Sequence, residues 1–111
     1  MKAIVQDRYG SPDVLRVAEV DTPTPEDGEV LVRVRTASVN IGDWHLMRGV
    51  PYVIRIGLGL RRPRRATPGR DIAGEVVAVG RGVTGVQPGE EVFGWGAGAF
   101  AEYLCAPERN L

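Results

Sequence analysis

The sequence predicts a mainly β domain, and three observations support this prediction. The 15 glycines and 8 prolines make up about a fifth of the 111 residues, against a usual share near 12%. Short runs rich in β-branched residues stand between these turn-forming residues. The length fits a single domain with one hydrophobic core. We therefore expect one β domain over residues 1–111.

The overall composition is that of an ordinary globular protein. Basic and acidic side chains balance at 14 each, with 43% apolar and 25% charged residues. No apolar run approaches the roughly 20 residues that cross a bilayer, and Asp7 interrupts the N-terminal apolar run too early for a secretory signal. The single cysteine, Cys105, cannot form an internal disulfide. These features predict a cytoplasmic domain without a membrane segment.

The N-terminal half contains three predicted strands. The first covers residues 2–6 and the second residues 14–20, which is followed by a proline-rich break over residues 21–28. Residues 29–38 form the clearest strand, because apolar and polar residues alternate along it. Its apolar surface on both faces favours a central position in the sheet. The residues expected on one face are Val30, Val32, Val34 and Thr36.

The pattern changes to that of a short helix after residue 39. Asn40 or Asp43 is a suitable N-cap residue for a helical turn through residues 44–48, and Gly49 is a suitable stop. Residues 51–68 show no clear period, and their glycines and prolines predict a long irregular loop.

The C-terminal half contains further predicted strands at residues 72–79, 91–94 and 98–105. Gly74 interrupts the first of these, and a glycine inside a strand requires a reason such as a bulge or a close backbone approach. Six or seven short strands with one helical turn favour a barrel or a sandwich.

Six segments in order carry a resemblance to a known family. They are residues 1–5, 12–15, 25–34, 39–43, 69–76 and 98–103. Together they resemble the N-terminal catalytic domain of medium-chain dehydrogenases/reductases, close to the quinone oxidoreductase branch. The resemblance covers essentially the whole chain. It implies a GroES-like, partly open β-barrel with one short helix and a long Arg-rich loop.

The resemblance also implies an activity and a cofactor. Members of this branch reduce a quinone, enone or related carbonyl compound with hydride from NADPH. Their dinucleotide is held by a Rossmann domain, which has no counterpart in these 111 residues; Gly94–Gly98 matches the glycine fingerprint only in part and leads into a predicted strand. We therefore expect NADPH to be held mainly by the missing domain, and this chain alone to be inactive.

The zinc-dependent branch of the family differs from this sequence at its metal ligands. A cysteine, a histidine and a glutamate of that branch are replaced here by Asn40, Arg70 and Asp71. Zinc prefers cysteine and histidine ligands, so we expect no metal. A carbonyl must then be polarised by hydrogen-bond donors.

Four residues are candidates for the site. The Asn40 amide has two compatible interpretations, a donor to substrate or nicotinamide and a helix cap. Asp43 follows three residues later and would orient Asn40 or hold Arg70, and a structural ion pair is the favoured role. His45 matches a proton-relay histidine of the zinc branch, but Gly42 replaces the preceding hydroxyl residue of that relay, which favours a surface or packing role. Tyr52 would donate to substrate or pack.

The remaining predictions concern partners. The basic run Arg61–Arg65 favours a solvated loop over an anion site, and the lack of interleaved aromatic residues argues against nucleic acid. Surface that would meet the missing cofactor domain is expected to be exposed and apolar, and such surface predicts a homo-oligomer. The alternative to a reductase domain is a free-standing GroES-like binding or assembly module without catalytic activity, because one fold hosts unrelated functions.

Overall fold

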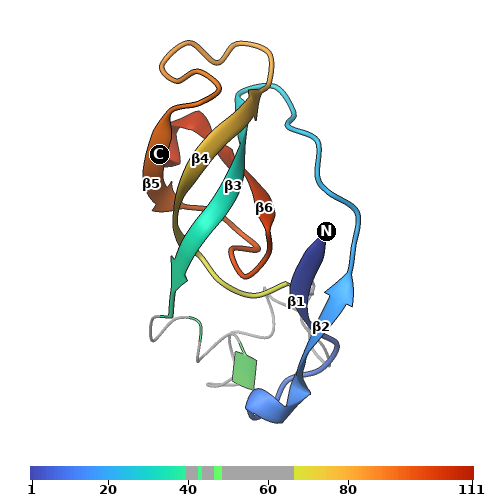
Figure 1. Ribbon diagram of the computed structural model, residues 1–111. Helices are drawn as coiled ribbons and strands as arrows, with labels where there is room; N and C mark the ends of the chain where they lie inside the picture. The colour runs from blue at the N-terminus through green and yellow to red at the C-terminus, as the bar shows by residue number, and fades with distance from the viewer. Residues whose placement is uncertain (40–42, 44–46, 49–66) are drawn as a thin grey trace.

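Two antiparallel sheets make up most of the computed structural model, which describes residues 1–39, 43, 47, 48 and 67–111 (Figure 1). The smaller sheet pairs β1 (Lys2–Gln6) with β2 (Leu15–Glu19), and a 3-10 helix at Pro12–Val14 precedes β2. The larger sheet has the strand order β5-β4-β3-β6. Its strands are β3 (Glu29–Ser38), β4 (Asp71–Val79), β5 (Glu91–Trp95) and β6 (Tyr103–Pro107).

The core lies inside the curl of the larger sheet. Alternate residues of β3 and β4 point into it, and Val30, Val32 and Val76 are at most 1% exposed. The buried core consists of Val30, Val32, Ile72, Val76, Ala99, Leu104 and Ala106. This inward face is the one that the alternation along residues 29–38 predicts, and β3 is central, as expected.

Small residues allow the sheet to curl until the chain at the end of β5 packs against β6. A side chain at Gly96 on the β5 side would lie 2.8 Å from Leu104 Cδ1 and 3.0 Å from Ala106 Cβ of β6. Within the described part of the chain no strand pairing joins β5 to β6, so the barrel is partly open. The mainly β, partly open fold expected from the sequence is confirmed.

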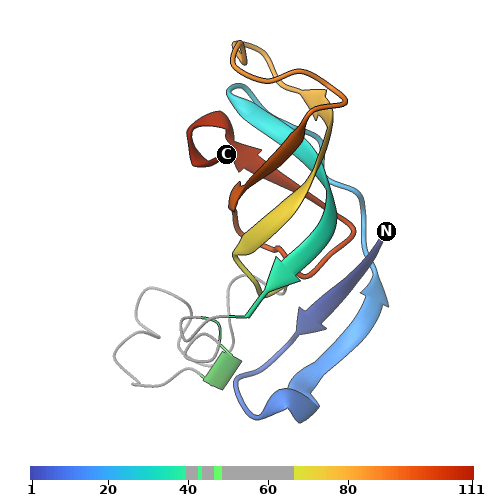
Figure 2. The same ribbon diagram turned by 60° about the vertical axis from the view of Figure 1, so that its left-hand side comes forward.

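The smaller sheet is attached to the larger one through β1. The Ile4 N–H donates to the Phe100 carbonyl at 2.8 Å, and the Glu102 N–H donates to the Lys2 carbonyl at 3.1 Å. The β1–β2 ribbon therefore lies beside the end of the larger sheet at which β3 finishes (Figures 1 and 2).

Three expectations about strands need correction. The second strand begins at Leu15, because Pro12 starts a 3-10 turn. The last strand runs over Tyr103–Pro107 and not over residues 98–105. Its start is displaced because Gly98 turns the chain with a φ of 82° and the Phe100 N–H bonds the Pro68 carbonyl at 3.0 Å.

Thr36 is the third correction. The pairing of β3 with β4 shifts register between Val34 and Thr36, so one residue is inserted there. Because a bulge shifts the alternation of faces along a strand, Thr36 is exposed and does not share the buried face of Val30 and Val32.

Gly74 does not interrupt its strand. β4 runs continuously through it, and Gly74 pairs with Val34 of β3. A side chain there would collide with the Arg33 carbonyl oxygen and lie 2.9 Å from Val32 Cγ1. Of the two reasons that the sequence offers for this glycine, the close backbone approach is present at Gly74 itself, and a register irregularity lies beside it between Val34 and Thr36 of β3.

Candidate functional site

The candidate site is built around the chain that follows β3. This strand ends at Ser38, and Asp43, Met47 and Arg48 are helical in the structure. The helical turn expected after residue 39 is therefore present at these three positions. Asp43 is 4% exposed, which places its side chain inside the protein rather than on a solvated face.

The helical turn is held by the segment that follows β1. The Gln6 Nε2 amide donates to the Met47 carbonyl at 2.7 Å and to the Arg8 carbonyl at 3.0 Å. The Gly10 N–H donates to the same Met47 carbonyl at 3.0 Å. Figures 1 and 2 both show the turn next to the β1–β2 connection. The Met47 carbonyl thus receives two donors from outside the helical residues.

A cation and an aromatic ring lie at the end of the larger sheet that leads to this turn. Asp71, the first residue of β4, pairs with Ser38 on one side and with Trp95 on the other. The neighbouring Arg70 guanidinium lies over the Trp95 ring, with Cζ 5.1 Å from the ring centroid. Trp95 is 47% exposed, so this cation–aromatic pair faces solvent.

Three of the four predicted site residues cannot be compared with the structure. Asn40, His45 and Tyr52 lie outside the described residues, as does the basic run Arg61–Arg65. Their assigned roles stay predictions. Asp43 is described and is buried, and its assigned roles stay predictions as well.

Sequence reasoning missed Gln6. It is the last residue of β1 and only 3% exposed, although glutamine is mostly found on protein surfaces. The available signal was a single amide directly after the apolar residues Ile4 and Val5. Its partner Met47 is 41 residues away in the sequence, so no local pattern could reveal the contact.

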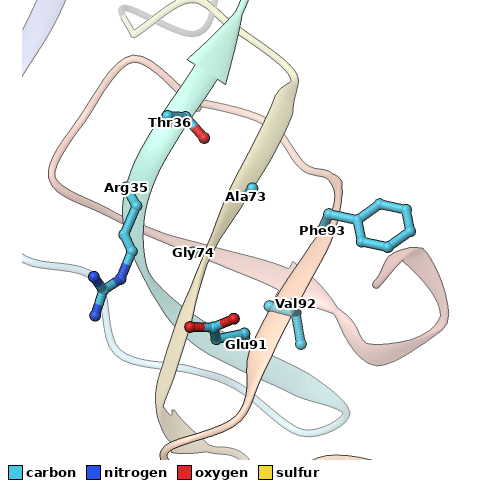
Figure 3. A pocket seen from close by; sticks show the side chains of 7 residues that line it. All are labelled: Arg35, Thr36, Ala73, Gly74, Glu91, Val92 and Phe93. Carbon is cyan, nitrogen blue, oxygen red and sulfur yellow. The ribbon is translucent and has the colours of Figure 1, made fainter.

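A shallow hollow of about 410 Å³ lies on the outer face of the larger sheet. It forms where the small Ala73 of β4 stands between Thr36 of β3 and Phe93 of β5. Figure 3 shows the Phe93 ring projecting away from β5 and Arg35 extending from β3. The hollow is lined by Arg35, Thr36, Ala73, Gly74, Glu91, Val92 and Phe93. It contains none of the predicted site residues.

The described residues do not fit a zinc site. Nowhere in the described part of the chain do three histidine, cysteine or carboxylate side chains come together in a way that could hold a metal. Arg70, which stands where the resemblance places a zinc ligand, offers a guanidinium stacked on Trp95. Burial raises the pKa of the Cys105 thiol to about 11, and nearby Glu29 and Glu26 add to this. A thiol with a raised pKa is a poor source of the thiolate that zinc requires.

The described residues also do not fit the phosphates of a dinucleotide. Such phosphates bind at a glycine-rich turn that opens a helix. The glycine-rich segment Gly94–Gly98 instead leaves β5, turns at Gly98 and continues to the bridge residue Ala101. The segment Gly94–Gly98 therefore does not open a helix. No helix among the described residues has the length and apolar character that crossing a bilayer requires.

A comparison with protein families gives a match over residues 26–111 to the alcohol dehydrogenase GroES-like domain. The chain belongs to this family. The GroES-like domain fits the mainly β, partly open fold described above, and the family agrees with the resemblance seen in the sequence.

Relatives of this GroES-like domain include quinone oxidoreductases. The chain is 37% identical to the chloroplastic quinone-oxidoreductase QR1 of Triphysaria versicolor, over 98% of this chain and 33% of that protein. The solved quinone oxidoreductase of Coxiella burnetii matches with a TM-score of 0.84 and 29% identity, over 99% of this chain and 35% of that one. A mycobacterial protein solved with NADPH matches with a TM-score of 0.83 and 30% identity, over 99% of this chain and 31% of that one. The chain thus spans about a third of the length of these relatives.

Proposed function

We propose that this GroES-like domain is the substrate-side part of a zinc-independent, NADPH-dependent oxidoreductase that reduces a quinone, an enone or a related carbonyl compound. The observation that carries the proposal is the match over almost the whole chain to a quinone oxidoreductase. The structural match to a protein solved with NADPH supports the choice of cofactor.

The proposed division of labour follows from what the described residues offer. NADPH supplies the hydride, and its phosphates are held by a second, nucleotide-binding domain of the kind the family uses. This domain contributes the helical turn after β3, with buried Asp43 and with Asn40 three residues before it. Asn40 donates its amide N–H to the carbonyl oxygen of the acceptor, and Asp43 orients it. His45 and Tyr52 contribute to binding the substrate or the cofactor in this proposal.

Zinc independence is part of the proposal because of the residues at the metal positions. An amide at residue 40 and a guanidinium at residue 70 are poor zinc ligands, whereas hydrogen-bond donors can stabilise the charge that develops on a carbonyl oxygen.

We propose a cytoplasmic location and a homo-oligomer. Exposed Phe93 and Val39, at 80% and 75% exposure, support the oligomer.

The test uses the whole protein that carries this chain. NADPH oxidation is followed with a naphthoquinone and with 2-cyclohexenone, before and after dialysis against EDTA. We expect turnover with at least one acceptor and no loss after EDTA. Absence of turnover with every acceptor would favour the non-catalytic binding module, and loss after EDTA with recovery on adding Zn²⁺ would refute zinc independence.

Asn40 has a test that separates its two roles. Asn40→Asp keeps an oxygen that can cap a helix but removes the N–H donor, and the removal of one such donor lowers kcat by about 10²–10³-fold. Asn40→Asp should therefore lose activity at unchanged thermal stability. The matched control is Gln87→Glu, the same amide-to-acid change at an exposed loop residue. If Asn40→Asp retains full activity, Asn40 is a cap only.

A further inference from the structure

A buried amide connects the end of β1 to the candidate site. Gln6 is 3% exposed, and a polar group that is buried without a hydrogen bond is costly. A glutamine Nε2 carries two hydrogens, and here each has its own acceptor, the carbonyls of Arg8 and Met47. The donor capacity of this amide is fully used.

The acceptor at Met47 is equally saturated. A backbone carbonyl has two lone pairs, and the Met47 oxygen accepts from Gln6 at 2.7 Å and from the Gly10 N–H at 3.0 Å. Any residue except proline could supply the second of these bonds, because its donor is backbone. The first depends on the glutamine side chain alone.

These contacts determine where the helical turn sits. Met47 stands four residues after Asp43 in the sequence, and both residues are helical. Hydrogen bonds from Gln6 and Gly10 therefore attach the helical residue Met47 to the end of β1 and to the segment after it. If the Gln6 bond is lost, the Gly10 N–H remains as the donor to the Met47 carbonyl among the described residues.

We propose that Gln6 is a positioning residue of the reductase site. Its bond to the Met47 carbonyl holds the helical residues that include buried Asp43, the residue proposed to orient Asn40. This inference rests on the proposed function. It adds a residue that contacts neither ligand and that acts from a different sheet.

The experiment compares two variants of the whole protein that carries this chain. Gln6→Met keeps the length of the side chain and removes both donors. Gln87→Met makes the same chemical change at an exposed residue of the loop between β4 and β5. Amide hydrogen exchange is measured at Met47 and Arg48 and, as an internal reference, at Val32 in the core.

We expect Gln6→Met to accelerate exchange at Met47 and Arg48 about tenfold with no change at Val32, since one lost hydrogen bond is worth roughly a factor of ten. KM for the acceptor should rise about tenfold, while kcat per folded molecule changes less than threefold. Gln87→Met should change neither quantity. A merely structural role would lower the folded fraction and leave KM at its original value.

Two outcomes overturn the proposal: exchange at Met47 and Arg48 that equals that of Gln87→Met, or accelerated exchange with KM unchanged in an active enzyme. A protein that oxidises no NADPH refutes the proposed function instead, and the exchange result then still reports on the contact. If Gln6→Met does not fold, Gln6→Glu replaces it. Its protonated carboxyl retains one donor, so KM should approach the wild-type value at pH 5.5 and exceed it at pH 8; equal KM ratios at both values count against the proposal.

Discussion

Substitution of Gly74 by alanine tests the claim that β3 and β4 approach too closely at this position for any side chain to fit. Alanine is ordinarily favoured over glycine in a strand by roughly 0.5–1 kcal/mol, because glycine loses more conformational freedom on folding. If the site had room, Gly74→Ala would therefore stabilise the chain. The structure predicts the opposite sign.

The size of the effect follows from the atoms that a new Cβ would meet. One is the backbone carbonyl oxygen of Arg33, and another is Cγ1 of the fully buried Val32 at 2.9 Å. Neither can rotate away, because one is backbone and the other is packed in the core. Overpacking costs 1–3 kcal/mol and occasionally more, so we expect the upper end, about 3 kcal/mol. A loss of this size lowers the melting temperature of a domain of about 100 residues by roughly 12 °C or more.

Urea unfolding of the chain, followed by far-ultraviolet circular dichroism, measures this difference. The control is Ala73→Gly, the reverse change at the neighbouring residue on the outer face, where only backbone entropy is lost and about 0.5–1 kcal/mol is expected. A Gly74→Ala chain that is as stable as the wild type, or more stable, would refute the close approach.

Three further predictions concern separate parts of the molecule. The Glu108 carboxylate accepts hydrogen bonds from the N–H groups of Thr84 and Gly85 at 3.1 and 2.6 Å. Glu108→Gln should therefore destabilise the chain by about 1 kcal/mol. The urea unfolding midpoint measures this loss, and Glu90→Gln in the exposed loop is the control. The Cys105 thiol has its pKa raised to about 11 from an ordinary 9.0. The neutral thiol therefore stabilises the folded state below pH 9, and this contribution is lost as the pH rises through about 11. Alkylation of Cys105 by iodoacetamide, followed by mass spectrometry, should be slow at pH 8 and should become faster up to pH 11. Rapid labelling of the folded chain at pH 8 would contradict this. Phe93 is 80% exposed on β5, and Phe93→Ser should shift sedimentation of the chain at high concentration toward the monomer, whereas an unchanged distribution would exclude this surface from self-association.

Local sequence patterns correctly predicted the parts of the fold that depend on the residues of a single strand. The strand over residues 29–38 has the predicted bounds, because its alternation is strong and a proline-rich segment precedes it. The sequence also singles out Gly74, because a glycine inside an apolar strand is costly without a reason. The structure supplies that reason in the neighbouring strand.

Contacts between distant segments account for what the sequence patterns missed. The alternation along residues 29–38 predicts Thr36 on the inner face, but a bulge in the pairing with β4 leaves Thr36 exposed. The last strand was started too early, because the turn at Gly98 depends on hydrogen bonds from Ala99 and Phe100 to residues 68 and 69. Each of these features depends on a partner strand that no periodicity within the segment records.

For the candidate site as well, some features follow from the sequence and others only from the tertiary structure. The sequence alone determined the family resemblance and the absence of zinc-binding residue types at residues 40 and 70, since these depend on which amino acid stands at a position. Only the tertiary structure decided that Asp43 is buried, that Arg70 stacks on Trp95 and that Gln6 holds the helical turn through Met47. A hydrogen bond or a stacking contact requires two groups within a few ångströms of each other, and the folded chain brings together residues that lie tens of positions apart.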